Sequence, residues 1–231
     1  MVLRHQVIFW SGTCGISVLE EKGIVLINTP DEYRTYHLLP EWYSDFEEET
    51  AKSVWEEQGS LENALEMAKA LEGAYIVKDY VKSRKHEWYD ACYIKNIADK
   101  NNTSKVIGNF IERQGVSLVG GIVLRKFEHL MQIGFHEKSG MPLSEEYRVF
   151  IYAGRILNIQ DYWTEKADVK ITDEEKHWLE EIAHKVKSNF VTVDIARKAN
   201  GSLVILEFGD GQVSGLQQMD AMDFYEARGR R

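Results

Sequence analysis

The sequence predicts an α+β protein whose first residues form a smaller α/β segment. Two observations predict the α+β part: antiparallel hairpins recur in the C-terminal half, and amphipathic helices precede them. Helices that pack on one face of an antiparallel sheet give this order of elements. The N-terminal end instead has a strand, a helix and a strand, which is typical of an α/β unit. We expect the α+β part to begin at about residue 74.

The N-terminal elements are a short strand at 6–10, a helix at about 15–22 and an apolar run at 24–27 that we interpret as a second strand. A turn over 28–31 follows. Residues 31–58 mix aromatic side chains with an acidic run, and we expect helical or irregular surface there. Aromatic side chains are frequent from Tyr33 to Trp88 and could stack on a base or another ligand, but covering a shallow core is the more ordinary role.

Helix and strand signals alternate in the middle of the chain. A helix begins after Ser60, a good N-cap residue, and ends at Gly73. A buried strand is predicted at 74–81, a second helix at 103–114 and a strand at 116–127. Each of these helices carries an apolar stripe at helical spacing and stops at a glycine.

The C-terminal part contains two hairpins separated by a helix. The first hairpin covers 147–162, and the second covers 191–208 with its turn at Asn200-Gly201. Between them, Thr172 and Glu175 have the spacing of a capping box, which predicts the start of a helix.

Composition limits the function. The chain has 231 residues, of which 37 are acidic and 28 basic, for a net charge of −9. A nucleic-acid coat protein needs a basic face, so that class is disfavoured. No apolar run approaches the ~18 residues of a membrane span, and the start lacks the features of a signal peptide. Two cysteines are too few for a disulfide framework. We expect a cytoplasmic protein that does not contact a membrane.

Two carboxylates face each other in the last hairpin. If the strands pair about the turn at 200–201, Asp194 and Glu207 lie opposite each other. Paired carboxylates repel unless a cation lies between them, and oxygen ligands of this kind suit Mg²⁺. Asp210 adds a third candidate ligand. Taken alone, these residues are explained as well by solvent-facing acids at a strand end.

Cations also occur within apolar strands. Lys78 ends one strand, Arg125 ends another apolar run and Arg148 lies inside a third strand. A basic segment, 82–86, follows the first of them. A buried cation needs a partner. For Arg148 the ordinary partner is Glu146, two residues away on the same face, and the alternative is a polyphosphate.

Together these features resemble the ATP-grasp family, and within it the clade named for two arginines and one lysine. The resemblance covers about residues 75–215. The matching segments, in order, are Ile76-Val77-Lys78, Val123-Leu124-Arg125-Lys126-Phe127-Glu128, Glu146-x-Arg148-Val149-Phe150, Asp194, and Glu207-Phe208-Gly209-Asp210-Gly211-Gln212. Two features depart from the family pattern. No glycine-rich loop follows Lys78, and Gly209 stands where the usual E-x-N motif has asparagine.

The resemblance implies the fold and the domain organisation. Two α+β subdomains that grip ATP would occupy residues 73–231, divided into 73–125 and 126–231. A reduced pre-ATP-grasp α/β domain would occupy residues 1–72.

The resemblance also implies a function. The chain would be an ATP-dependent carboxylate–amine ligase that forms an amide or peptide bond through an acyl-phosphate, with ATP and Mg²⁺ bound. A peptide or protein is one candidate substrate, while the identities of the acid and amine and the oligomeric state stay open. The implied catalytic residues are Arg148 and Arg125. The implied nucleotide-binding residues are Lys78, Lys82, Lys126, Phe127, Glu128 and Arg148. The implied metal ligands are Asp194, Glu207 and Asp210, and the implied substrate contacts are Gln212, Ser214 and Gly215.

Two other functions compete with the ligase. The first is a non-catalytic ATP-binding regulator, against which the full set of carboxylates argues. The second is an enzyme that modifies nucleic-acid ends through the basic segment 82–86, against which the net negative charge argues.

Overall fold

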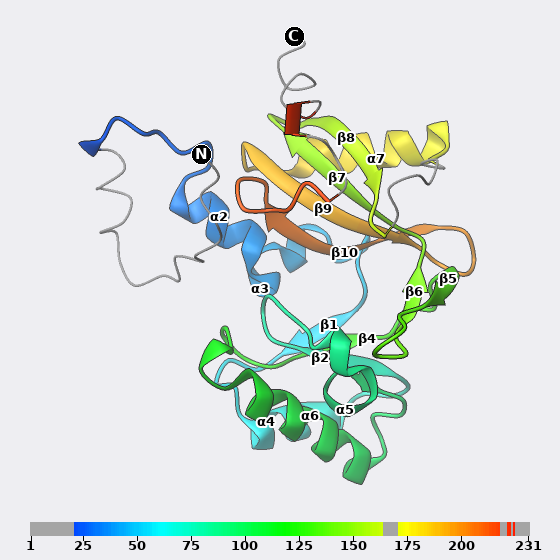
Figure 1. Ribbon diagram of the computed structural model, residues 1–231. Coiled ribbons are helices and arrows are strands. Elements are labelled where there is room, and N and C mark those ends of the chain that lie inside the picture. The colour runs from blue at the N-terminus through cyan, green and yellow to red at the C-terminus, as the bar shows by residue number, and fades with distance from the viewer. Residues whose placement is uncertain (1–20, 164–170, 218–220, 223, 225–231) are drawn as a thin grey trace.

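Two antiparallel sheets of four strands each organise the chain, and a two-stranded sheet lies beside them (Figure 1). The computed structural model describes residues 21–163, 171–217, 221, 222 and 224. The predicted strand at 6–10 and nearly all of the predicted helix at 15–22 lie outside these ranges. None of the helices within these ranges combines the length and the apolar character needed to cross a membrane. The helices are α2 (Pro30–His37), α3 (Leu39–Trp42), α4 (Leu61–Ala68), α5 (Trp88–Ala91), α6 (Lys100–Gln114) and α7 (Asp173–Lys185). The strands are β1 (Ser53–Trp55), β2 (Tyr75–Lys78), β3 (Tyr93–Ile94), β4 (Val123–Lys126), β5 (Gln132–Phe135), β6 (Pro142–Ser144), β7 (Glu146–Tyr152), β8 (Arg155–Asp161), β9 (Phe190–Arg197) and β10 (Leu203–Asp210).

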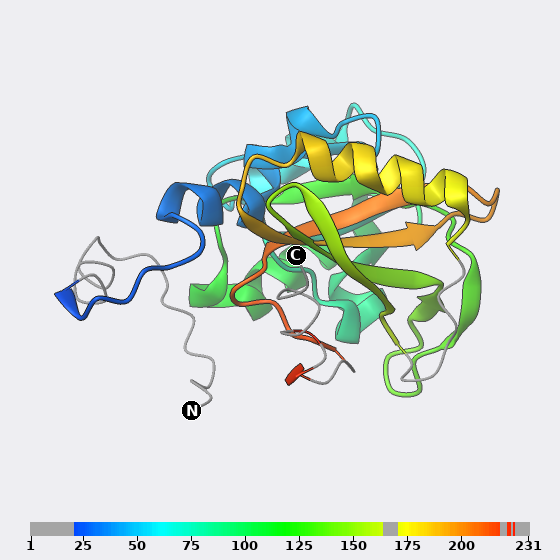
Figure 2. The same cartoon turned by 90° about the horizontal axis from the view of Figure 1, so that it is seen from above.

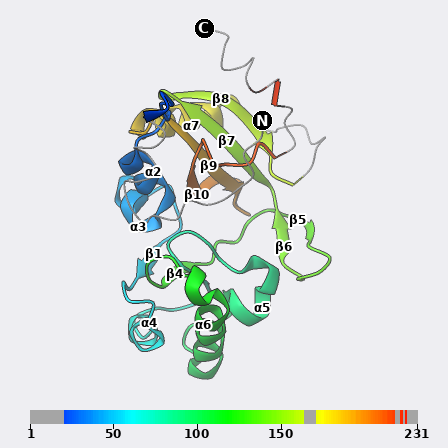
Figure 3. The same ribbon diagram turned by 60° about the vertical axis from the view of Figure 1, so that its left-hand side comes forward.

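The first lobe consists of β1–β4 with α4, α5 and α6. Its strands lie in the order β1-β4-β2-β3, and α4 and α6 lie on one side of this sheet (Figure 3). Val77 of β2 and Leu124 of β4 pack with Val106 and Phe110 of α6 in one buried core. The opposite side of the sheet is therefore left to face the rest of the molecule.

The helices of the first lobe begin where side chains cap them. Ser60 accepts a hydrogen bond from the backbone N–H of Asn63 at 3.4 Å, so the predicted start of α4 is confirmed. The helix α6 begins at Lys100, three residues before the predicted start. Asp99 causes this difference, because its carboxylate accepts from the N–H of Asn102 at 3.1 Å and caps the helix earlier.

The strand predicted at 116–127 is much shorter than expected. Residues Gly115–Ser117 form a 3-10 turn, and β4 begins only at Val123. Gly121 explains the delay. A Cβ atom there would lie 1.6 Å from the backbone oxygen of Glu56, so only glycine allows this approach of two backbones.

The second lobe consists of β7–β10 with α2, α3 and α7. Its strands lie in the order β10-β9-β7-β8, and α7 lies along one face of the sheet (Figure 2). Leu179 and Ile182 of α7 pack on Val149 and Val193 in the larger core. The predicted capping box at the start of α7 is confirmed, because Thr172 and Glu175 exchange side-chain to backbone hydrogen bonds. Both predicted C-terminal hairpins form.

The aromatic segment before residue 58 is core and not surface. Tyr36, Trp42 and Phe46 are buried and surround Phe208 of β10, with ring centroids 5.3, 5.1 and 4.6 Å from it. The expectation of a helical or irregular surface was wrong for these side chains. Their role in covering a core is confirmed, because α2 and α3 close one face of the second sheet.

The residues before 73 that the structure describes do not form a unit of their own. Residues 24–27 form no strand. The helix α2 packs on β10 of the second lobe, whereas β1 pairs with β4 and α4 shares the core of the first lobe. The division predicted at residue 72 therefore does not separate packed units. Both α4 and β1 lie before the expected boundary, but α4 packs in the core of the first lobe and β1 pairs with the edge of β4.

Candidate active site

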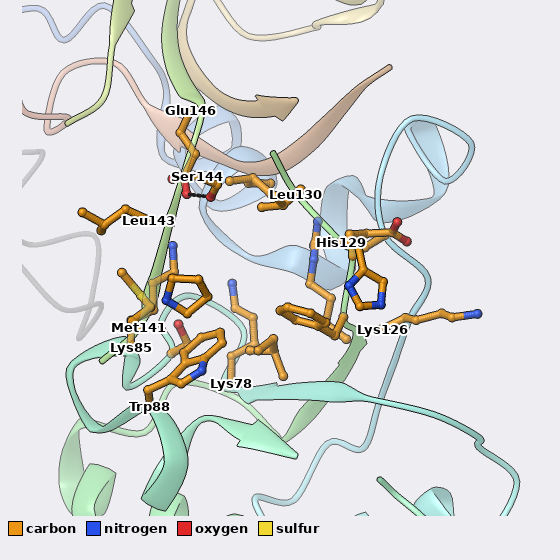
Figure 4. A pocket seen from close by; sticks show the side chains of 18 of the residues that line it. Lys78, Lys85, Trp88, Lys126, His129, Leu130, Met141, Leu143, Ser144 and Glu146 are labelled. Carbon is orange, nitrogen blue, oxygen red and sulfur yellow. Dashed lines mark hydrogen bonds between the residues drawn. The ribbon is translucent and has the colours of Figure 1, made fainter. Parts of the chain in front are cut away.

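A cavity of about 230 Å³ opens where the two lobes meet (Figure 4). Its walls come from β2 and the segment after it, from the end of β4 and the residues that follow, from β6, and from β10. The lining residues are Ala51, Ile76, Lys78, Ser83, Lys85, Trp88, Arg125, Lys126, Phe127, Glu128, His129, Leu130, Gln132, Met141, Pro142, Leu143, Ser144, Glu146, Leu206 and Glu207.

One end of the cavity is apolar and aromatic. Trp88 stacks on Tyr93 with ring centroids 5.2 Å apart and an angle of 3°, and Phe127 meets Tyr93 edge-on at 4.9 Å. Met141 packs in the same cluster and is buried. This rigid wall suits a flat aromatic ligand. Trp88 belongs to the aromatic-rich stretch seen in the sequence, but no local pattern points to Met141.

The other end of the cavity is cationic. Lys78 and Arg125 lie on the same face of the first sheet, because Arg125 pairs with Ile76 and Lys78 is two residues further along β2. Burial lowers the pKa of Lys78, an effect that Glu207 partly opposes. Burial also lowers the pKa of Arg125, to about 10, so this side chain stays charged at neutral pH.

Arg125 is incompletely paired. Its Nη2 donates to the hydroxyl of Thr50 at 2.7 Å and to the carbonyl of Ile205 at 2.8 Å. Its Nη1 is buried and has no hydrogen-bond partner among the described residues. A buried guanidinium with an unused donor is suited to an anion.

Lys85, and not Lys82, is the lysine of the basic segment that lines the cavity. Part of this side chain is exposed; desolvation of the rest would lower its pKa, but Glu146 and Glu207 outweigh that effect and raise it. The Lys82 side chain is exposed, and its backbone N–H donates to Asp79 at 2.6 Å. This bond ties the chain back at position 82, so the segment reaches the cavity only from Ser83 onward.

The segment 126–128 lines the cavity as expected, with a difference in detail. The side chain of Lys126 extends away from the cavity (Figure 4). The backbone N–H groups of Lys126 and Phe127 donate to Lys52 and Ala74. These two N–H groups are therefore used within the first lobe, and the ring of Phe127 is the main surface that this segment presents.

The two carboxylates of the last hairpin are direct neighbours. Glu207 and Asp194 are paired across β10 and β9 as predicted, after a register shift of one residue between Ile205 and Glu207. The Nζ of Lys78 lies 3.9 Å from Glu207 and connects the two lobes. Burial alone would raise the pKa of Glu207, but Lys78 and Lys85 outweigh it and lower that pKa.

Arg148 pairs with Asp194 and not with Glu146. Its Nε and Nη2 donate to the two carboxylate oxygens of Asp194, each at 2.7 Å, in a bidentate pair. The guanidinium also lies 5.1 Å from the centre of the Tyr162 ring. Burial and the nearby Glu207 raise the pKa of Asp194 to about 6, against the lowering effect of Arg148. Glu146 instead accepts from Ser144 at 2.5 Å.

Asp210 does not join this carboxylate pair. It is three residues from Glu207 on β10, so the two side chains lie on opposite faces of the strand. Its carboxylate accepts from the side-chain amide of Asn28 at 2.5 Å and from the N–H of Gln212 at 2.8 Å. Within the described ranges, no three acidic, histidine or cysteine side chains are grouped to hold a metal ion. The expected third ligand is therefore not brought to the pair.

The residues after β10 contact Arg148 and its neighbours and not the cavity. Gly215 accepts from Nη1 of Arg148 at 3.2 Å. The Ser214 hydroxyl lies 2.7 Å from that of Thr192, and the side chain of Gln212 accepts from the N–H of Ile27 at 2.7 Å. None of these three residues lines the cavity.

The side chains of the cavity fit a nucleotide and a divalent cation. Lys78, Lys85 and Arg125 bring positive charge to a space that contains an unused guanidinium donor. Asp194 and Glu207 place carboxylate oxygens, a ligand type that suits Mg²⁺, next to each other; Glu207 lines the cavity and is partly exposed, whereas both oxygens of Asp194 accept from Arg148.

Solved structures share this fold at low sequence identity. The ATP-grasp ligase PsnB, in a complex with its minimal precursor, is 14% identical with a TM-score of 0.53, and the match covers 91% of this chain and 64% of PsnB. D-alanyl-alanine synthetase A from Vibrio cholerae is 12% identical with a TM-score of 0.57, and the match covers 93% and 67% of the two chains. D-cycloserine synthetase DcsG is 13% identical with a TM-score of 0.57, covering 94% and 78%. The chain thus spans about two thirds of the length of PsnB, and no curated protein sequence matches it.

The family relationship rests on the sequence itself. A model of the ATP-grasp domain, for family 3 of the clade named for two arginines and one lysine, matches residues 65–227, which is more than half of the chain. The matched region contains the cavity's cationic end, the carboxylate pair and Arg148. The mixed α+β architecture agrees with the ATP-grasp fold of the solved structures. The chain belongs to the ATP-grasp proteins, in family 3 of the two-arginine, one-lysine clade.

Proposed function

We propose that this protein is an ATP-dependent carboxylate–amine ligase that forms an amide bond through an acyl-phosphate. One observation carries the proposal: a single cavity joins an aromatic wall to a cationic end beside two adjacent carboxylates. ATP has the matching order of parts, a flat base followed by a chain of phosphates. Membership of the ATP-grasp family supports the same ligand.

The base and the phosphates would use different parts of the cavity. Trp88, Phe127 and Met141 would hold adenine by packing and stacking. Lys78, Lys85 and Arg125 would neutralise the phosphates, and the unused Nη1 of Arg125 would gain a partner. Side chains of the segment after Lys82 would thereby do the work that a glycine-rich loop does with backbone N–H groups.

Phosphoryl transfer would occur near Arg148. Asp194 and Glu207 would hold Mg²⁺, which when bound screens the charge on the β- and γ-phosphates. Arg148 would keep its bond to Asp194 through one edge of the guanidinium and direct Nη1 toward the transferring group. Arg125 would stabilise the same charge from the first lobe.

Two structural neighbours support an amino-acid or peptide substrate. PsnB was crystallised with its precursor peptide PsnA2, and another neighbour is a D-alanyl-alanine synthetase. The acid would therefore be the carboxyl group of an amino acid, peptide or protein, and the second substrate an amine. The segment that carries Gln212, Ser214 and Gly215 would lie beside it.

Release of ADP from ATP tests the proposal directly. The full chain with Mg²⁺ and a panel of amino acids and peptides should form ADP over many turnovers only when an acid and an amine are both present, because the acid alone supports at most a single turnover to the acyl-phosphate. Glu207→Gln should weaken Mg²⁺–AMPPNP binding by about 10- to 100-fold, because a charged ligand of the cation is lost. Glu174→Gln changes an exposed glutamate of α7 and serves as the matched control.

The other outcomes separate the competing functions. Tight AMPPNP binding without ADP formation from any acid and amine would indicate a regulator. ADP or AMP formation that depends on RNA and falls with salt would indicate a nucleic-acid enzyme. Unchanged Mg²⁺–AMPPNP affinity in Glu207→Gln would contradict the metal assignment.

A further inference from the structure

Asn28, in the segment before α2, is joined to the end of the last hairpin. The side chain is 2% exposed. Its Nδ2 donates to the carbonyl of Phe190 at 2.6 Å and to Asp210 at 2.5 Å. Its Oδ1 accepts from the N–H of Phe190 at 2.8 Å. All the polar atoms of this buried amide are thus used on β9 and β10, which fixes the orientation of the amide.

Asp210 in turn holds the segment 211–215 through hydrogen bonds to its backbone and side chains. Its carboxylate accepts from the N–H of Gln212, and its carbonyl accepts from the N–H of Ser214 at 3.1 Å and from the Ser214 hydroxyl at 2.8 Å. The side chain of Gln212 returns to the N–H of Ile27, next to Asn28. The segment is therefore built on Asp210 and held from the N-terminal side.

The segment ends at Arg148. The carbonyl of Gly215 accepts from Nη1 of Arg148 at 3.2 Å, and the rest of that guanidinium is bound to Asp194. Ser214 also meets Thr192, two residues from Asp194 on β9. Asn28 is therefore bonded to Asp210, Asp210 holds Ser214 through its backbone carbonyl, and the next residue, Gly215, accepts from the guanidinium of Arg148.

We infer that Asn28 and Asp210 are a positioning pair that orients the segment 211–215 and, through Gly215, the guanidinium of Arg148 toward the phosphates. Asp210 acts here as the acceptor for a buried amide and not as a ligand of the metal. The inference rests on the proposed function for the identity of the ligand. The hydrogen bonds between Asn28, Asp210 and the segment 211–215 do not depend on that identity.

The chemistry of the pair permits an exchange of its two side chains. In Asp210→Asn, the new Nδ2 faces the Nδ2 of Asn28, so two donors meet. In Asn28→Asp, two carboxylates meet. In the double variant Asn28→Asp with Asp210→Asn, the amide at 210 donates to the carboxylate at 28, and its oxygen still accepts from Gln212, whereas the carbonyl of Phe190 loses its donor and faces a carboxylate oxygen. The double variant therefore restores the contact between positions 28 and 210, but not the bond to Phe190, and contains no carboxylate at position 210.

Calorimetric titration of the full chain with Mg²⁺–AMPPNP and with AMP tests the inference. Each single variant should weaken AMPPNP binding about tenfold, because a charge-assisted hydrogen bond is lost and Arg148 is released. AMP binding should change less than about twofold, because AMP lacks the phosphates near Arg148. The double variant should bind AMPPNP more tightly than either single variant and less tightly than the parent, because the Phe190 carbonyl still lacks its donor. Asn200→Asp, in the exposed hairpin turn, is the matched control.

Several results would overturn the inference. If the affinity loss of the double variant equalled the product of the two single losses, positions 28 and 210 would not be coupled, and the pair would be refuted. Equal loss of AMPPNP and AMP affinity in the single variants would show a general loss of structure. If the parent binds neither nucleotide, the proposed function fails, and amide hydrogen exchange over 211–215 still decides the pair. Exchange should then be faster in the single variants and partly restored in the double variant, and equal exchange in all four proteins would refute the pair.

Discussion

Arg125 is a charged side chain at a buried position, where an uncharged side chain would oppose folding less. It is 7% exposed, it donates to Thr50 and Ile205 through Nη2, and its Nη1 has no partner in the described part of the chain. Desolvating a guanidinium in this way opposes folding. A group of this kind is useful when an anion completes its hydrogen bonds. The unused donor of Arg125 therefore explains both the loss of folding stability and the proposed binding role.

Arg125→Met should separate stability from binding. The free energy of unfolding of the ligand-free protein should fall by no more than about 1 kcal/mol, because methionine removes the buried charge and Thr50 keeps its bond to Ile205. Mg²⁺–AMPPNP affinity should fall about 100-fold. Denaturant unfolding and calorimetry measure the two quantities. Arg155→Met, at an exposed position on β8, is the control, and full AMPPNP affinity in Arg125→Met would contradict the binding role.

At the scale of elements, α7 is fastened at its first turn. Glu175 accepts from the N–H of Thr172 at 2.9 Å and completes the capping box. It also pairs with Arg197 at the end of β9, which binds Glu145 at 2.7 Å as well. One glutamate therefore caps the helix and attaches it to the sheet whose core it covers.

The contribution of Glu175 to the free energy of unfolding should depend on pH. Burial alone would raise the pKa of Glu175, but Arg197 and Thr172 outweigh it and lower the pKa below its ordinary value of 4.5. Its stabilising contribution is thus complete above about pH 4.5 and is lost as the pH falls through the lowered value. Glu175→Gln should cost about 1 kcal/mol at pH 7 and progressively less as the pH falls below 4.5. Glu174→Gln should follow the parent at every pH, and a difference for Glu175→Gln that stayed constant with pH would refute the assignment.

At the scale of the whole molecule, the cavity belongs to both lobes. Lys78 and Arg125 come from the first sheet, while Glu207 and the carbonyl bound by Arg125 come from β10 of the second. Each lobe has its own apolar core, and Val123, Trp55 and Tyr80 of the first lobe also pack with the core of the second. A ligand that fills the cavity would therefore add contacts between the lobes.

Nucleotide binding should stabilise the molecule as one unit. At about 100 times its Kd, Mg²⁺–AMPPNP should add about 2.7 kcal/mol, which corresponds to a rise in Tm of roughly 5–10 °C for a chain of this size. Lys78→Met should reduce this rise at the same AMPPNP concentration, and Lys176→Met, exposed on α7, should not. Thermal unfolding by calorimetry measures both. A ligand that shifted only one of two separate transitions would contradict a site shared by the lobes.

Local rules account for the parts of the site that were predictable. The turn at 200–201 locates the hairpin and brings Asp194 close to Glu207, so the two could be placed together before the fold was known. The exact pairing depends on a register shift between Ile205 and Glu207, which the turn does not predict. Capping residues at positions 60 and 172 located two helices in the same way. Each of these features depends on residues within one hairpin or one helical turn.

Other features depended on contacts between distant segments. The aromatic residues of α2 and α3 are buried because Phe208, far along the chain, lies beneath them. Met141 joins Trp88 across the cavity, and no periodicity links those two positions. Lys82 and Lys85 are indistinguishable as basic residues in one segment until the bond to Asp79 decides which of them faces the cavity.

The sequence by itself determined the fold class, the family resemblance, the carboxylate pair and the strand-borne cations. It could do so because alternation, capping and turn chemistry act over a few residues. Only the tertiary structure decided the partners: Arg148 binds Asp194, and Asp210 turns to Asn28, 182 residues away. The physical reason is that a charged side chain takes the best partner that packing brings near it, and packing joins segments whose separation along the chain carries no signal.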